Sequence, residues 1–171
     1  KKCGMFTGNQ KDENCDYLFA TIQTIGKAEY FSKFKRDEFS YVVIDEAHVF
    51  IDPKQTVALD FMQQMAKRIR KYNGMLIIIT QNIKDFVGSE EIAQQSTAVI
   101  NACQYSFIFS LSPNDMDDLC TLYDKAGRIN TVEQEQIVNN DRGNAFIITG
   151  PTSRTNIEIV ASPKIRAIFH E

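Results

Sequence analysis

Two adjacent carboxylates, Asp45 and Glu46, directly follow the apolar run Tyr41–Ile44. This run has the β-branched content of a strand, so we expect the acids at the carboxyl end of a strand, where ligands bind in open α/β sheets. Asp45 can hold Mg²⁺ there, usually through water, because this hard ion favours carboxylate and phosphate oxygens. Glu46 can orient or deprotonate a water that attacks a γ-phosphate. The pair indicates nucleotide hydrolysis, and the alternative is that the acids only cap the following helix.

A second polar marker follows the next predicted strand, Met75–Ile79. Gln81 lies just beyond this strand, where it can contact the γ-phosphate or the attacking water, although it could also be part of a polar turn. His48 could couple the nucleotide site to a neighbouring surface or satisfy a local hydrogen bond. We therefore predict Glu46 and Gln81 as catalytic residues. The predicted ligands of ATP and Mg²⁺ are Asp45, Glu46, Gln81 and His48, with Asp45 holding the metal.

The sequence does not contain the phosphate-binding motif G-x-x-x-x-G-K-[ST]. Gly26-Lys27 is followed by Ala28 and has no glycine five residues before it. Without the amides and the lysine of such a loop, nothing identifiable cradles the β- and γ-phosphates. We expect the isolated chain to bind ATP poorly and to hydrolyse it hardly at all.

The composition favours a single soluble domain. The chain has 171 residues, of which 43% are hydrophobic and 24% charged, as in ordinary globular proteins. A net charge of −3 gives no general attraction to nucleic acid or anionic lipid. Apolar runs are too short for a membrane helix, no leader is evident, and the four cysteines are widely spaced. These features predict a cytoplasmic protein, and the absence of an initial Met suggests a fragment of a longer one.

Short apolar segments alternate with amphipathic ones, a pattern typical of a mostly parallel sheet covered by helices. We expect strands at residues 17–20, 39–44, 75–79 and 105–111. The first and third of these are expected to be buried, and the second to be a central strand buried on both faces. Helices are expected near residues 27–34, 52–72, 89–102 and 113–127, with a short one from Thr131, whose spacing to Gln134 suits a capping box. The helix at 52–72 carries one apolar stripe and stops at Asn73-Gly74, and Ser89 can cap the helix that follows. Residues 145–149 and 155–160 predict a C-terminal β-hairpin. The predicted fold class is a three-layer α/β domain.

Several cations offer weaker signals. The cluster Lys67–Lys71 could contact DNA phosphates, but such a run is more often a solvated helix end. Arg128, Arg142 and Arg154 are each candidates for an arginine finger that acts on a neighbouring subunit's nucleotide. The sequence does not choose among them.

From Tyr41 onward the chain resembles the C-terminal ATPase domain of conjugative-transfer and type IV secretion ATPases, the VirB/TraC/TrbE-like group. Five ordered blocks carry this resemblance: Val43–Asp52, Met65–Tyr72, Ile79–Phe86, Phe109–Asp115 and Ala145–Pro151. The resemblance implies a partial RecA-like P-loop NTPase core over residues 1–171 that uses ATP and Mg²⁺. It also implies a homo-hexamer that works with secretion-channel or conjugation proteins at the inner face of the cell membrane.

Residues Lys1–Ser40 instead resemble the first motor domain of superfamily 2 helicases, through Gly4–Gly8 and Leu18–Thr24. The two resemblances meet at Val43–His48, which suggests a junction between two gene segments. The leading interpretation is a partial ATPase motor of the secretion or conjugation type. The alternatives are a fragment of a DNA or RNA helicase and a non-catalytic interaction module that keeps the RecA-like fold.

Overall fold

The computed structural model describes residues 2–7, 9–12, 15–20, 40–47, 51, 57–150 and 152–169. It divides the chain into two compact units, Lys1–Ala102 and Cys103–Glu171. Each unit is described by itself below. The prediction of one domain over residues 1–171 stays a prediction.

The first unit contains two pairs of parallel strands. β1 (Cys3–Phe6) pairs with β2 (Tyr17–Ala20), and β3 (Tyr41–Ile44) pairs with β4 (Met75–Ile78). β2, β3 and β4 confirm the expected strands at residues 17–20, 39–44 and 75–79, whereas β1 was not expected from the sequence. The pairing of β3 with β4 confirms the expected parallel order. The helix expected near residues 27–34 lies outside the described residues.

The chain returns from β3 to β4 through α3 (Val57–Arg68) and the 3₁₀ helix η2 (Ile69–Tyr72). After η2, Asn73 adopts a left-handed backbone with φ of 52°, a conformation that asparagine tolerates at helix ends. This confirms the predicted stop at Asn73-Gly74. The predicted start of the helix at Asp52 lies outside the described residues.

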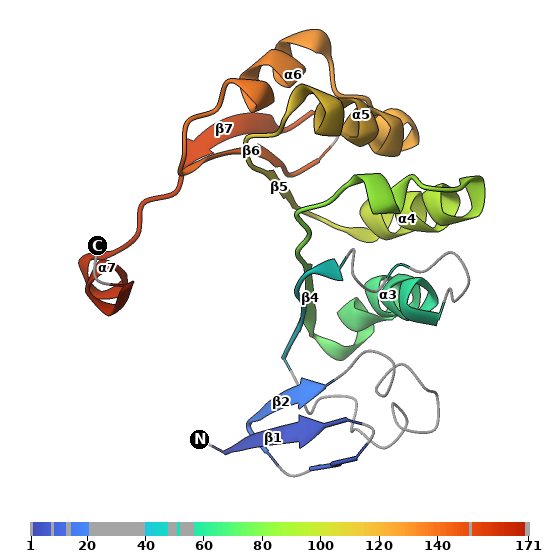
Figure 1. Cartoon of the computed structure of the whole chain (residues 1–171), viewed down its shortest axis with the longest axis vertical. Helices are drawn as coiled ribbons and strands as arrows, with labels where there is room; N and C mark the ends of the chain where they lie inside the picture. Colours follow the sequence, from blue (N-terminus) through green and yellow to red (C-terminus); the bar gives the residue numbers. More distant parts are fainter. Residues whose placement is uncertain are drawn as a thin grey trace. The chain divides into compact units, whose positions relative to one another are not determined.

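α4 (Glu90–Ala102) packs against α3, and both lie on the same side of β4 (Figure 1). The short 3₁₀ helix η3 (Lys84–Phe86) precedes α4, and Ser89 accepts a hydrogen bond from the Ile92 amide at 3.3 Å, as its predicted capping role requires. The apolar stripe predicted for residues 52–72 forms the core of this unit together with α4. The buried side chains on these elements are Leu59, Phe61, Met62, Met65, Ala66, Ile69, Ile92 and Val99.

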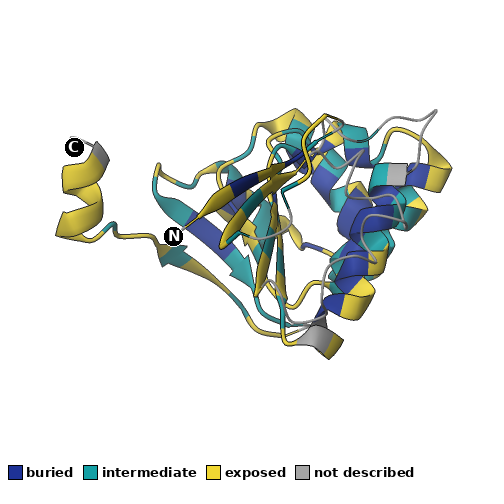
Figure 2. Ribbon diagram, turned by 90° about the horizontal axis from the view of Figure 1, so that it is seen from below, coloured by how far each residue is buried: buried dark blue, intermediate teal, exposed yellow. Residues whose placement is uncertain are grey.

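The expectation that the strand at residues 39–44 is buried on both faces is wrong, and β2 and β4 are also less buried than expected. Side chains alternate between more buried and exposed positions along β3 and β4, and most of β2 is exposed (Figure 2). An unbroken β-branched run predicts a strand covered on both faces. The physical reason for the difference is that α3 and α4 pack on one side of β4, and they cannot cover the opposite face.

The second unit contains a three-stranded antiparallel sheet, and two of its helices lie together on one side of this sheet (Figure 1). β5 (Ser106–Ile108) pairs with β6 (Asn144–Ile148), which pairs with β7 (Arg154–Glu158). This confirms the C-terminal hairpin, whereas the strand expected over residues 105–111 is shorter. α5 (Pro113–Gly127) and α6 (Thr131–Val138) connect β5 to β6, and α7 (Pro163–Phe169) follows β7.

Polar side chains fix the starts of α5 and α6. The Ser112 hydroxyl accepts from the Asp115 amide, with Pro113 in the first helical turn. The predicted capping box of α6 is displaced by one residue, because Asn130 and Glu133 exchange the two hydrogen bonds at 2.9 Å each. Asparagine is the stronger N-cap residue, so it displaces Thr131 from this role.

Arg154 holds the junction between α5 and α6. From β7, its guanidinium donates to the carbonyl oxygens of Gly127 at 2.8 Å and Arg128 at 3.0 Å. It also pairs with the Glu133 carboxylate at 3.0 Å, and both side chains are largely buried. Glu133 belongs to the capping box, so this single arginine joins the end of one helix, the start of the next and the hairpin.

We predict that Arg154→Met lowers the free energy of unfolding by about 2–3 kcal/mol, since it leaves two carbonyls and a buried carboxylate without their donor. Urea denaturation followed by circular dichroism measures this loss. Arg142→Met is the matched control, because Arg142 is exposed and its change should stay within about 0.5 kcal/mol. Equal losses in both variants would contradict the role given to Arg154.

Candidate nucleotide site at the ends of two parallel strands

The carboxyl ends of β3 and β4 lie side by side because of their register. Tyr41 is opposite Met75, and Ile44 is opposite Ile78. The pairing continues past the strands, where the Ala47 amide donates to the Ile79 carbonyl at 2.8 Å. The residues that follow the two strands are therefore held at the same edge.

This edge brings the two predicted catalytic residues together. The side-chain amide of Gln81 donates a hydrogen bond from Nε2 to Oε1 of Glu46 at 3.0 Å. The two residues are 35 positions apart in the sequence, so the contact depends on the pairing of β3 with β4. The contact matches the geometry expected of the pair, while their catalytic roles stay predictions.

Glu46 has an unusual backbone for a residue with a side chain. Its φ is 48°, in the left-handed region, which costs an L-residue about 1–2 kcal/mol. The next residue, Ala47, is fully buried, which anchors the chain directly after the bend. At this bend the Glu46 carboxylate accepts the hydrogen bond from Gln81. Strained backbone of this kind is concentrated at functional sites.

Asp45 is exposed at the same edge. Its Oδ1 accepts a hydrogen bond from the Glu46 amide at 3.0 Å, which orients the carboxylate and leaves the second oxygen for another partner. In the part of the chain that the structure describes, no three His, Cys, Asp or Glu side chains gather to hold a metal ion. A single carboxylate suits Mg²⁺ bound mainly by phosphates and water, so the residues present fit this ion.

The turn that carries Gln81 is fixed by its own hydrogen bonds, which sequence reasoning did not identify. The Asn82 amide donates to Thr80 Oγ1 at 3.2 Å, and Asn82 Nδ2 donates to Asp85 Oδ2 at 2.8 Å. Ile83 and Phe86 are buried behind the turn. The signal was present in the spacing of Thr80, Asn82 and Asp85, which suits a side-chain-stabilised turn.

His48 lies outside the described residues, so its predicted role in the site stays a prediction.

Of the arginine-finger candidates, Arg154 is held by the α5–α6 junction and cannot reach outward without breaking it. Arg128 is exposed and paired with Asp124 at 2.6 Å, which raises the pKa of its guanidinium. Arg142 is exposed. In the predicted DNA-contact cluster, Lys67, Arg68 and Lys71 are exposed at the helix end.

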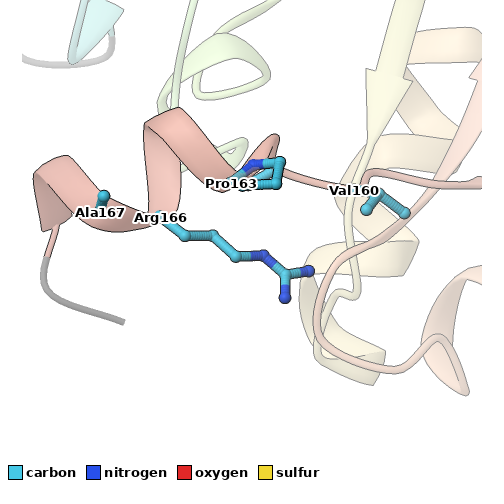
Figure 3. Close-up of a pocket in the computed structure, with 5 residues that line it drawn as sticks. Val160, Pro163, Arg166 and Ala167 are labelled. Carbon is cyan, nitrogen blue, oxygen red and sulfur yellow. The ribbon is translucent and has the colours of Figure 1, made fainter.

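A separate open hollow of about 490 Å³ lies against α7 in the second unit (Figure 3). Arg166 extends along it, and Val160, Ala161, Pro163 and Ala167 complete its lining. It contains none of the predicted site residues.

No helix in the described ranges has both the length and the apolar character needed to cross a membrane.

The parallel strand pair carries its two acids and the amide at the carboxyl edge, where ligands bind in open α/β sheets. Residues 9–146 match the family model described as the TraG P-loop domain, and the chain belongs to this family. The match begins at residue 9, so it includes most of the segment that resembles helicases. The hypothesis of a junction between two gene segments stays untested.

The chain is also similar to the solved structure of VirB4 from Thermoanaerobacter pseudethanolicus. The two share 28% sequence identity, with a TM-score of 0.72 over 90% of this chain. The fold is therefore partial RecA-like, as predicted. The match covers 44% of the VirB4 chain, so this chain spans less than half of that protein's length. The comparison with curated proteins gave no significant match.

The strain at Glu46 gives a testable prediction about stability. Glu46→Ala and Glu46→Gly both remove the carboxylate, but only alanine keeps a Cβ in the left-handed backbone. We expect the glycine variant to be more stable than the alanine variant by about 1 kcal/mol, measured by urea denaturation. If the alanine variant is equally stable, the backbone at Glu46 is not constrained as described.

Proposed function

We propose that this chain supplies the metal-binding and water-activating half of an ATPase site in a motor of the conjugative-transfer or type IV secretion type. The observation that carries the proposal is the hydrogen bond between Gln81 and Glu46 at the carboxyl edge of β3 and β4. Membership of the TraG P-loop domain family supports the nucleotide as ligand. Similarity to the solved structure of VirB4 supports the assignment to a motor of the conjugative-transfer or type IV secretion type.

Each residue at the edge has a role that its position allows. Asp45 is exposed and presents a carboxylate oxygen to the Mg²⁺ that accompanies ATP. This ion neutralises charge that develops on the phosphates. Glu46 orients the attacking water and accepts its proton, while Gln81 holds the Glu46 carboxylate and reports the state of the γ-phosphate through β4.

The site needs a phosphate-binding loop to become complete. The 171 residues contain no G-x-x-x-x-G-K-[ST] sequence, so the amides and lysine that hold the β- and γ-phosphates come from another segment. In the whole motor, the active form is a homo-hexamer that works with secretion-channel or conjugation proteins at the inner face of the membrane. The proposal also keeps His48 as a ligand of the nucleotide.

The test uses the chain fused to a P-loop segment, by which we mean a strand, a G-x-x-x-x-G-K-[ST] loop and a helix from another member of the family. We expect this fusion to hydrolyse ATP in the presence of Mg²⁺. Glu46→Gln should lower turnover by about 10²-fold or more, because the amide cannot accept the proton of the attacking water. ATP binding, measured with a fluorescent analogue, should stay unchanged.

Glu91→Gln is the matched control, since Glu91 is exposed on α4 and makes the same chemical change outside the site. Its turnover should equal that of the unmodified fusion. Retained turnover in Glu46→Gln would remove the catalytic assignment. A fusion that binds no nucleotide at all would favour the non-catalytic interaction module.

A further inference from the structure

The position of Gln81 depends on the backbone that carries it. Gln81 is exposed at the carboxyl edge of β3 and β4, so tight packing does not restrict its rotamers. Its side-chain amide nevertheless meets Glu46 at 3.0 Å. A functional side chain keeps such a geometry when the residues that support it are themselves held in place. The support of Gln81 must therefore lie in the turn between β4 and the 3₁₀ helix η3.

The turn has a first fixed point at Ile79, two residues before Gln81. The Ile79 amide donates to the Ile44 carbonyl at 2.9 Å, and the Ile79 carbonyl accepts from the Ala47 amide at 2.8 Å. Ile44 and Ala47 are both buried. This end of the turn is thus an extension of the strand pairing, because both backbone groups of Ile79 are bonded to the β3 segment.

The turn has a second fixed point in η3, after Gln81. Ile83 and Phe86 are 8% and 6% exposed, and the Phe86 amide donates to the Ile83 carbonyl at 2.9 Å. Asp85 lies between these two anchored residues and is half-buried. Its Oδ2 accepts a hydrogen bond from Asn82 Nδ2 at 2.8 Å. Asp85 therefore ties the turn to a segment that is held by the core.

The two neighbours of Gln81 close the turn around it. Thr80 Oγ1 accepts from the Asn82 amide at 3.2 Å and donates to the Asn82 carbonyl at 3.1 Å. The side chain of Asn82 is bonded to Asp85 in turn. An ionised carboxylate can only accept hydrogen bonds, so Asp85 also determines which end of the Asn82 amide faces it. Both side chains that flank Gln81 thus serve to shape its backbone.

We infer that Asp85 is a positioning residue for Gln81, and that it acts through the side chain of Asn82. The inference rests on the proposed function, to which it adds the device that holds Gln81 against Glu46 before a nucleotide binds. Asp85 contributes an acceptor for Asn82 and takes no part in the chemistry. Its carboxylate can therefore be exchanged with the Asn82 amide without loss of the device.

The test exchanges the two partners of this hydrogen bond in the P-loop fusion. Asn82→Asp alone sets two carboxylates opposite each other, and their repulsion opens the contact. Asp85→Asn added to it restores a donor opposite an acceptor, with the direction of the bond reversed. We expect Asn82→Asp to lower kcat by about tenfold or more and to change KM by less than about twofold, since substrate binding does not use the turn. The double variant should recover kcat to within about threefold of the unmodified fusion.

NMR of the full 171-residue chain reads the position of Gln81 directly and needs no activity. The side-chain amide signal of Gln81 in Glu46→Ala defines the state without the hydrogen bond. We expect Asn82→Asp to move the signal towards that state and the double variant to move it back. Asp85→Ala, which removes the acceptor without adding a charge, should move the signal in the same direction as Asn82→Asp.

Gln95→Glu is the matched control, because Gln95 Nε2 donates to Asp60 Oδ1 at 2.9 Å between α4 and α3. It creates the same like-charge pair in the same unit but away from the site. Neither kcat nor the Gln81 signal should change in this variant. Circular dichroism establishes that each variant is folded, and an equal displacement of the Gln81 signal in the control would overturn the inference.

An unchanged Gln81 signal in both Asn82→Asp and Asp85→Ala would also overturn the inference, as would an unchanged kcat of Asn82→Asp in an active fusion. A double variant as impaired as Asn82→Asp would do the same, because Asp85 would then act through something other than this bond. If the unmodified fusion binds ATP without hydrolysing it while the double variant restores the Gln81 signal, the proposed function is refuted and the positioning role stands.

Discussion

The parallel pairing of β3 with β4 is the constraint on which the rest of the first unit depends. Hydrogen bonds extend the pairing past both ends of the strands, from Met75 to Ser40 at one end and from Ala47 to Ile79 at the other. A slip of one residue would exchange the faces of every side chain in the moved strand. It would also shift Gln81 along the edge and break its contact with Glu46. The contact between Gln81 and Glu46 and the exposure of Val43 and Ile77 on one face are thus two consequences of one register.

Much of this arrangement could be predicted from local sequence. Strands, helix ends and the hairpin follow from apolar periodicity and from signals such as Ser89 and Asn73-Gly74, which act within a few residues. The meeting of Glu46 with Gln81 could be anticipated because both directly follow strands. The left-handed backbone at Glu46 could not, since nothing in its side chain favours that conformation. The choice of Asn130 over Thr131 as N-cap depends on a difference in capping strength that spacing alone does not reveal.

The exposed strand faces show why burial was harder to predict than structure type. A β-branched run such as Tyr41–Ile44 records that both faces of a strand are apolar, and it carries no information about which polypeptide covers them. α3 supplies one covering layer, because its stripe from Leu59 to Ile69 is apolar and adjacent in the chain. The second unit shows the same principle, since Arg154 connects three elements whose proximity no local pattern encodes.

The carboxyl edge of β3 and β4 supplies one part of the site that the proposed function requires. Asp45, Glu46 and Gln81 can hold the metal and the water side of a nucleotide, but the phosphates need amides from a helix amino end. Under the proposed function, the left-handed backbone at Glu46 and its contact with Gln81 hold the carboxylate in place before the phosphates bind, so this group is ordered by folding and not by the nucleotide.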